Sequence, residues 1–113
     1  MEYGKFPAYR PRRMRATETM RRYIRETELS AKDFIYPLFV KPGIGLRDEI
    51  SSMPGVYQVS IDMLEAEMRE LAGLGVMSVL LFGIPSHKDE CGSEAYDDHG
   101  IVQEAVRAIR AKA

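Results

Sequence analysis

Two runs of apolar residues dominate the pattern of this chain. Residues 33–40 (DFIYPLFV) and 76–82 (VMSVLLF) are almost continuously aliphatic, β-branched or aromatic, as in strands that are covered on both faces. Pro37 interrupts the first run, and because proline lacks a backbone N–H donor, we expect an irregularity in the strand there. The two runs predict two buried strands of a sheet.

Three other stretches have the spacing of helices. Apolar residues recur every three or four positions from Ile61 to Leu71, which predicts a helix over residues 60–72 with Ser60 as its N-cap. A last helix is expected from about Gly100, where a similar apolar stripe begins. A short helix is predicted over residues 17–25, capped by Thr17 or Thr19. The main elements therefore alternate as strand, helix, strand, helix.

The connecting segments are polar. Residues 1–16 contain two prolines and no apolar period, which predicts an extended arm. Residues 41–59 form a long connection that contains Pro54-Gly55, a good pair for a type II turn. Residues 86–98 form an acidic loop. A connection as long as residues 41–59 more often has a function than serves only as a link.

Strands separated by a helix are expected to be parallel neighbours in one sheet. A parallel sheet needs cover on both faces, which two strands and two helices cannot supply. The pattern therefore predicts the opening of a larger β/α repeat. We expect the isolated chain to be poorly stable or to self-associate through its exposed strand edges.

Composition narrows the class of protein. The chain has 113 residues, of which 45% are hydrophobic and 29% charged, as in ordinary soluble globular proteins. Residues 1–5 lack the apolar core of a signal peptide, and no apolar run is long enough to span a bilayer. Cys91 is the only cysteine, so no internal disulfide can form. We expect a cytoplasmic protein without membrane contact.

Charge is distributed unevenly along the chain. Residues 1–25 carry eight basic and two acidic side chains, whereas the whole chain has a net charge of −1. An arginine-rich arm of this kind can hold nucleic-acid phosphates, remain a solvated tail, or contact carboxylates on a second subunit. Aromatic residues are sparse in the arm and no nucleic-acid module is recognisable, so we favour contact with a second subunit and expect no nucleic-acid partner.

Six segments, taken in order, resemble the porphobilinogen synthase (delta-aminolevulinic acid dehydratase) family. They are RPRRMR (10–15), RYIRETELS (22–30), DFIYPLFV (33–40), ISSMPGVY (50–57), SVLLFGIP (78–85) and KDECGSEA (88–95). No single segment is decisive, but the ordered set is highly specific and covers nearly the whole chain. The resemblance implies an α/β fold: a basic N-terminal arm with a short helix over residues 1–30, then over residues 31–113 the first two βα units of a truncated (β/α)8 TIM barrel.

The resemblance also implies an activity. Members of this lyase family condense two 5-aminolevulinate molecules to porphobilinogen in haem biosynthesis, through Schiff bases on two lysines of later strands. Zinc or magnesium, where the family uses it, is bound beyond this segment, and the arm embraces a neighbouring subunit, usually in a homo-octamer. We therefore expect an inactive N-terminal fragment without catalytic or metal-binding residues. The alternative is a non-enzymatic module that uses its arm to bind nucleic acid or a protein.

Five residues that could carry chemistry also have simpler explanations. Lys41 follows the first strand, where barrel enzymes place their chemistry, but a Lys-Pro-Gly turn favours a solvated lysine over a nucleophile. Resemblance makes Phe82 a candidate wall of the substrate pocket, although apolar strand ends usually only fill space. His87, Cys91 and His99 lie among acidic residues, yet they lack the paired spacing of a zinc site, and Cys91 lacks a clear thiolate-stabilising neighbour.

Overall fold

The computed structural model describes residues 4–112. The strands of the described part are β1 (Ile35–Val40), β2 (Arg47–Glu49), β3 (Tyr57–Val59) and β4 (Ser78–Gly83). The α-helices are α1 (Glu18–Tyr23), α2 (Leu64–Gly73) and α3 (Ile101–Lys112). Short 3-10 turns are η1 (Arg13–Arg15), η2 (Ala31–Asp33), η3 (Ile61–Met63) and η4 (Ser93–Ala95). Both apolar runs thus form strands, and the three predicted helices are confirmed.

Strands β1 and β4 are parallel neighbours, as the helix between them predicted. Their register runs without a break from Ile35 opposite Ser78 to Val40 opposite Gly83. Beyond the strand ends, the backbone N–H of Ile84 donates to the carbonyl of Val40 at 2.7 Å. Helix α2 is the crossover between the two strands. Together, β1, α2 and β4 form a parallel βαβ unit, which positions the loops that follow the two strands.

The expected irregularity at Pro37 is absent, because Pro37 pairs with Leu80 inside the unbroken register. Backbone groups of a parallel strand alternate between its two neighbours. Lys41 N donates to Val59 O on the β3 side, so the nitrogen of Pro37, four residues earlier, points to that same side. Strand β3 pairs with β1 only at Phe39 and Val40. The missing donor of Pro37 therefore costs no hydrogen bond in the ladder.

The connection over residues 41–59 is more ordered than the sequence indicated. It forms β2 and β3, which pair antiparallel, and the sheet has the order β2-β3-β1-β4. Strands of three residues are too short to show an apolar period, and all of β2 is exposed, so the sequence pattern missed them. The turn at Pro54-Gly55 is confirmed: Val56 N donates to Met53 O at 3.0 Å, and Gly55 has a φ of +82°.

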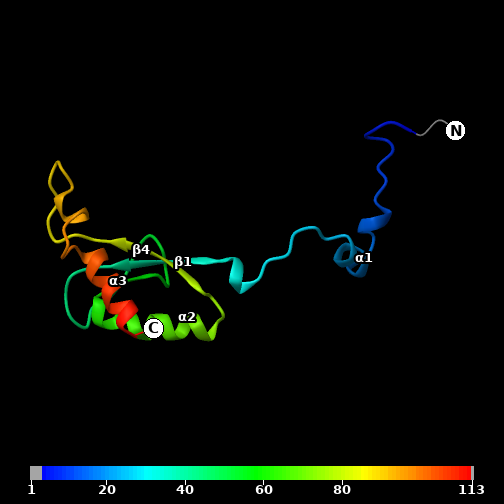
Figure 1. Cartoon of the computed structure of the whole chain (residues 1–113). Helices are drawn as coiled ribbons and strands as arrows, with labels where there is room; N and C mark the ends of the chain where they lie inside the picture. Colours follow the sequence, from blue (N-terminus) through cyan, green and yellow to red (C-terminus); the bar gives the residue numbers. More distant parts are fainter. Residues whose placement is uncertain (1–3, 113) are drawn as a thin grey trace.

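Figure 1 shows α2 and α3 on the same side of β1 and β4. The side chains buried on that side form the core. Their exposed fractions range from 0% to 6%: Leu38, Val40, Val59, Leu64, Leu71 and Ala105. The buried core residues thus come from β1, β3, α2 and α3, while β4 adds the partly buried Val79 and Leu81.

The opposite face of the sheet is uncovered. Alternate residues of β1 and β4 point away from the helices, and Ile35, Leu80 and Phe82 remain 65%, 53% and 45% exposed. These are the side chains that the sequence pattern predicted to be buried on a second face. The described residues thus build one half of the cover that a parallel sheet requires.

Two predicted caps have different outcomes. The Thr17 side chain accepts a hydrogen bond from Met20 N at 3.2 Å, so Thr17 rather than Thr19 caps α1. Ser60 precedes η3, but its hydroxyl oxygen accepts from Leu46 N at 2.9 Å instead of capping the helix. Because Ser60 is fully buried, its hydroxyl must be satisfied, and the nearby loop offers the donor.

Residues 4–30 extend away from the sheet and its helices as an arm (Figure 1). Helix α1 buries no residue, and Tyr23 is 81% exposed. The molecule measures 73 × 36 × 26 Å along its principal axes, and the arm accounts for this elongation. The predicted arm is therefore extended, with η1 and α1 as its local structure.

Leu64→Ala is expected to lower the free energy of unfolding by about 2–5 kcal/mol, because Leu64 is 2% exposed in the core. Ile44→Ala, at a side chain 88% exposed, is the matched control and should change it by less than about 0.5 kcal/mol. Urea unfolding followed by circular dichroism measures both. Equal effects of the two substitutions would contradict the core described above.

Candidate functional site

The carboxyl ends of β1 and β4 meet at one edge of the sheet, where the loops after both strands begin. Val40 lies opposite Gly83 at this edge. A β-carbon on Gly83 would lie 2.6 Å from Val102 Cγ2, so only glycine lets α3 approach β4 this closely. In βα-repeat proteins this edge carries the binding and catalytic residues.

Phe82 stands near this edge on the uncovered face. Its ring stacks on that of Phe39, with centroids 5.3 Å apart and an angle of 19° between the planes. The two residues are cross-strand partners in the parallel register. The stacking restricts the Phe82 side chain while its 45% exposure leaves ring surface available for contact.

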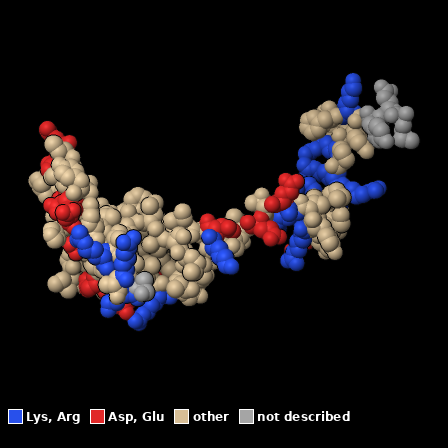
Figure 2. Space-filling model, viewed as in Figure 1, with Lys and Arg blue, Asp and Glu red and all other residues tan. Residues whose placement is uncertain are grey.

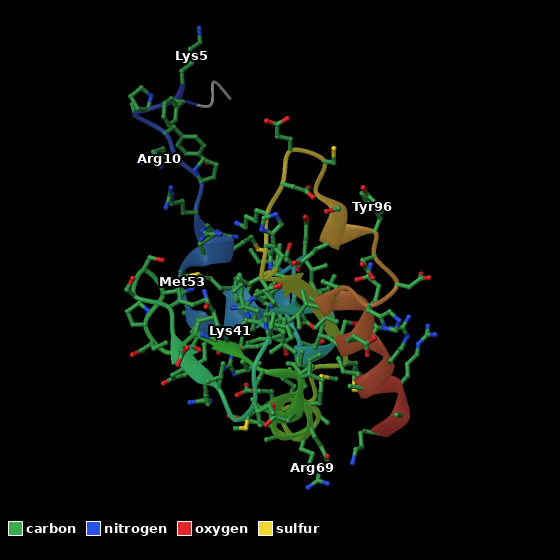
Figure 3. All side chains as sticks on the ribbon, turned by 90° about the vertical axis from the view of Figure 1, so that its left-hand side faces the viewer. Lys5, Arg10, Lys41, Met53, Arg69 and Tyr96 are labelled. Atoms are coloured by element: carbon green, nitrogen blue, oxygen red, sulfur yellow. The ribbon has the colours of Figure 1, made fainter. Side chains whose placement is uncertain are left out.

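Lys41 directly follows β1 and is held by its surroundings. Its ammonium group donates to the carboxylate of Asp48 on β2, and the Lys41 side chain is only 19% exposed. The expectation of a solvated lysine is therefore wrong, because the β2–β3 pair, which the sequence pattern missed, covers it. Figure 3 shows Lys41 within the body of the domain. The terminal nitrogen of Lys41 is thus engaged by Asp48 and is not presented to the open edge of the sheet.

Two buried or bonded side chains hold the loop that follows Lys41. Besides the Ser60 hydroxyl on Leu46 N, the Asp62 carboxylate accepts from Gly45 N at 2.8 Å. The hydrogen bond from Ser60, followed by that from Gly45, lowers the pKa of Asp62 below its ordinary value. The loop beside the strand ends is thus fixed by groups from the start of the following helix.

The acidic loop after β4 is organised by its own carboxylates. Glu94 accepts from the backbone N–H groups of Ser86 and His87, at 3.1 and 2.9 Å, and from the Ser86 hydroxyl at 2.9 Å. Asp89 accepts from the Ser93 hydroxyl and, at 2.9 Å, from Ser93 N. The hydroxyl donor is the main cause that lowers the pKa of Asp89. These carboxylates therefore serve the loop conformation, and Figure 1 shows the arm on the far side of the molecule.

The side chains of the acidic loop after β4 do not form a site for a metal ion. Across residues 4–112, no group of three or more His, Cys, Asp or Glu side chains is placed to hold one. His87 and Cys91 are exposed, and the carboxylates of Asp89 and Glu94 are already bonded within the loop. A zinc site needs about four converging ligands. No step of chemistry through a metal can be assigned to these side chains.

One charged arrangement was missed by the sequence analysis. The Arg47 guanidinium lies 3.6 Å from the centre of the Tyr57 ring, and its Nε donates to Glu67 at 3.2 Å. The Glu67 hydrogen bond is the main cause that raises the pKa of Arg47. Arg47 is 20 positions from Glu67 in the sequence, so no local spacing signals the contact. It joins β2 and β3 to α2.

One hollow lies away from the strand ends. It is a groove of about 500 Å³ between α2 and α3, with Met68, Ala72 and Ile109 among its lining residues. Phe82 and Lys41 do not line it. A second hollow, of about 370 Å³, lies at the strand ends, with Pro42, Ser86 and Ile101 among its lining residues, and Phe82 and Lys41 do not line it either.

Parallel strands joined by a helix, with one open apolar face, define an α/β chain of the βα-repeat class. A family model described as "Delta-aminolevulinic acid dehydratase" matches residues 8–113. The chain belongs to this family, whose activity gives it the second name porphobilinogen synthase. The resemblance seen in the six sequence segments is confirmed.

Relatives are similar over most of this chain. Delta-aminolevulinic acid dehydratase from Synechococcus elongatus is 53% identical over 105 residues, which are 93% of this chain and 32% of that protein. The Bacillus subtilis enzyme of the same name is 50% identical over 101 residues, 89% of this chain and 31% of that protein. The chain thus spans about a third of the length of these relatives.

A solved structure has the same arrangement of elements. The crystal structure of delta-aminolevulinic acid dehydratase (porphobilinogen synthase) from Toxoplasma gondii ME49, in complex with the reaction product porphobilinogen, matches with a TM-score of 0.81. It is 29% identical, and the match covers 92% of this chain and 30% of that chain. The mixed α/β fold is therefore that of the family.

The Asp89 carboxyl is expected to titrate below its ordinary pKa of 3.8, and Ser93→Ala should move the midpoint up towards it, because the main donor is lost. A lowered pKa means that the carboxylate stabilises the loop above pH 3.8, and that this stabilisation is lost as the pH falls through the lowered value. NMR titration of the carboxyl carbon measures both. Ser93→Thr keeps a hydroxyl and is the control; identical midpoints in all three chains would contradict the assignment.

Proposed function

We propose that this chain supplies the N-terminal arm and the first two βα units of a porphobilinogen synthase barrel. The main support is the family match over residues 8–113, and the uncovered apolar sheet face agrees with it. The inward side chains of a (β/α)8 barrel pack against those of the other strands. Residues 31–113 are thus an incomplete domain, and residues 1–30 are the arm.

The whole protein condenses two 5-aminolevulinate molecules to porphobilinogen, a lyase step of haem biosynthesis. A Schiff base forms when a neutral lysine amine adds to a substrate carbonyl and water leaves. We do not assign Lys41 as that amine, because its side chain is only 19% exposed and its terminal nitrogen contacts the Asp48 carboxylate. We therefore assign the Schiff-base lysines to the part of the family's polypeptide that this chain does not cover, and expect the chain alone to be inactive.

Phe82 forms one wall of the substrate pocket. Its position near the carboxyl end of β4, its exposed ring and its stacking on Phe39 support this role. A flat, apolar ring at this edge can exclude water beside a condensing carbon chain. The described residues add no catalytic group to it.

The family is generally metal-dependent. The side chains of residues 4–112 do not converge on a metal ion, so we assign zinc or magnesium ligands, where the whole protein uses them, to the remaining two thirds. A bound ion would supply Lewis-acid or structural chemistry there.

The arm joins subunits, in an assembly that is a homo-octamer. Figure 2 shows Lys and Arg side chains along the arm, with acidic side chains on the loop at the opposite end of the molecule. Arg22 pairs with Glu18, and Arg21 donates to the carbonyl of Arg15 at 3.1 Å, both within the arm. A second copy offers carboxylates of the right charge. Nucleic-acid binding, the alternative, finds no support in the comparisons.

The whole protein is assigned to the cytoplasm. None of the helices in the described part of the chain is long and apolar enough to cross a membrane. Cys91 is exposed and unpaired with another cysteine, as is common in a reducing compartment. Both observations fit a biosynthetic enzyme that works on a small soluble substrate.

Grafting tests the proposed function. The matching segment of the Synechococcus elongatus relative is replaced by this chain, and porphobilinogen formation is measured, with borohydride trapping of the 5-aminolevulinate adduct by mass. We expect turnover and a covalent mass gain in the chimera, and neither in the isolated chain. A folded chimera without either signal would overturn the proposal, and turnover by the isolated chain would overturn the assignment of the lysines.

Phe82→Ala in the same chimera should raise KM for 5-aminolevulinate several-fold with a smaller change in kcat, because a wall of the pocket is removed. Phe82→Leu keeps an apolar side chain and should recover part of the loss. Steady-state kinetics and thermal unfolding are measured together. A lower unfolding temperature with unchanged KM would instead assign Phe82 to packing alone.

A further inference from the structure

We infer that Lys41 is a latent carbonyl-reactive amine on the Phe82 side of the sheet, and that Asp48 keeps it from reacting, an inference that rests on the proposed function. The proposed chemistry forms its Schiff bases on other lysines and leaves the Lys41–Asp48 ion pair without a role. The role assigned to the pair is to restrict Schiff-base formation to those other lysines. Asp48 acts through Lys41 and is therefore a positioning residue.

Lys41 lies on the same face of the sheet as Phe82. Its N–H donates to Val59 O at 2.9 Å, so it continues the ladder of β1 by one residue. Side chains alternate along a strand, and Val40, the preceding residue, is buried against the helices. Lys41 therefore points to the side of Phe39, whose ring stacks on that of Phe82.

Asp48 reaches Lys41 from that same face. In the sheet, Asp48 lies opposite Gln58 on β3, and Gln58 lies opposite Phe39 on β1. Residues that are opposite each other in register share a face of the sheet, so the Asp48 carboxylate is on the side of Phe39. The Lys41 ammonium donates to this carboxylate. The ion pair is thus a consequence of the register of three neighbouring strands.

Strand β2, which carries Asp48, is fastened on its other face. Arg47 precedes Asp48 and points to the helix side, where its guanidinium lies 3.6 Å from the centre of the Tyr57 ring. Its Nε donates to Glu67 on α2 at 3.2 Å. These contacts hold β2 against β3 and α2. The Asp48 carboxylate is therefore kept beside the Lys41 amine in the folded chain.

The exposure of the two partners indicates what removal of the carboxylate does. The Lys41 side chain is 19% exposed and that of Asp48 is 59% exposed, so the carboxylate is the partner that faces solvent. A mostly covered lysine without a carboxylate beside it is more often neutral, and the neutral amine is the nucleophile. The amine, after losing a proton to water, bonds to the ketone carbon of 5-aminolevulinate, and the carbonyl oxygen leaves as water to give a C=N bond.

Borohydride trapping tests the inference on the full chain. The unsubstituted chain and Asp48→Ala are incubated with 5-aminolevulinate, reduced with borohydride, which adds hydride to the imine carbon, and analysed by peptide mass. We expect at least about tenfold more adduct at Lys41 in Asp48→Ala. Asp48→Glu keeps the carboxylate and is the matched control. The exposed lysines elsewhere in the chain are internal standards: Lys5, Lys32, Lys88 and Lys112.

Equal adduct at Lys41 in the three chains, or adduct spread evenly over all lysines, would overturn the inference. Where Asp48→Ala fails to fold, a salt series on the unsubstituted chain replaces it. Salt screens a partly exposed ion pair, so the share of adduct at Lys41 should rise several-fold between about 0.01 and 1 M salt. A constant share would then overturn the inference.

Rescue in the Synechococcus elongatus chimera separates this role of Asp48 from packing. Asp48→Ala should lower kcat/KM several-fold, because an imine at Lys41 occupies the face that carries Phe82. A second substitution, Lys41→Met, removes the amine and should restore kcat/KM. An unchanged kcat/KM, or a loss that Lys41→Met does not restore, would overturn the role of Asp48.

The outcomes also separate this inference from the proposed function. An inactive chimera, together with a Lys41 adduct in the Asp48→Ala chain, refutes the enzyme assignment and supports the latent amine. An active chimera without any Lys41 adduct in Asp48→Ala refutes the latent amine and leaves the proposed function standing.

Discussion

The parallel pairing of β1 with β4 is the interaction on which the rest of the structure depends. Its unbroken register fixes two faces: one presents Leu38 and Val40 to the helices, and the other presents Leu80 and Phe82 to no described element. Because side chains alternate along each strand, covering one face leaves the other exposed. The one-sided core, the stacked Phe39–Phe82 pair and the free edge of β4 all follow from that pairing.

The strand ends gain their order from contacts between residues seven to 17 positions apart in the sequence. Asp48 on β2 forms an ion pair with Lys41. Ser60 and Asp62 accept hydrogen bonds from the loop between β1 and β2, and Glu94 accepts from the start of the loop after β4. Polar side chains at this edge are therefore occupied in fixing backbone conformation.

Prediction from sequence succeeded for elements that have a local signal in the sequence. The buried-type strands, the amphipathic helices over about 60–72 and from about 100, and the turn at Pro54-Gly55 each have a period or turn signal of their own. Prediction failed where the outcome depends on contact with another segment of the chain. Pro37 causes no break because β3 starts to pair later, and the environment of Lys41 depends on Asp48, seven positions away on a strand too short to be predicted.

The sequence by itself determined the order of the main elements (β1, α2, β4 and α3), the uneven charge of the arm and, through six ordered segments, membership of the family. Only the tertiary structure decided that both helices cover the same face, that two short strands extend the sheet, and that the acidic side chains of the loop bond to Ser86, His87 and Ser93. The physical reason is the separation along the sequence over which each effect acts. Periodicity and turn chemistry act over a few residues, whereas burial and hydrogen-bond satisfaction are settled between segments that meet only after folding.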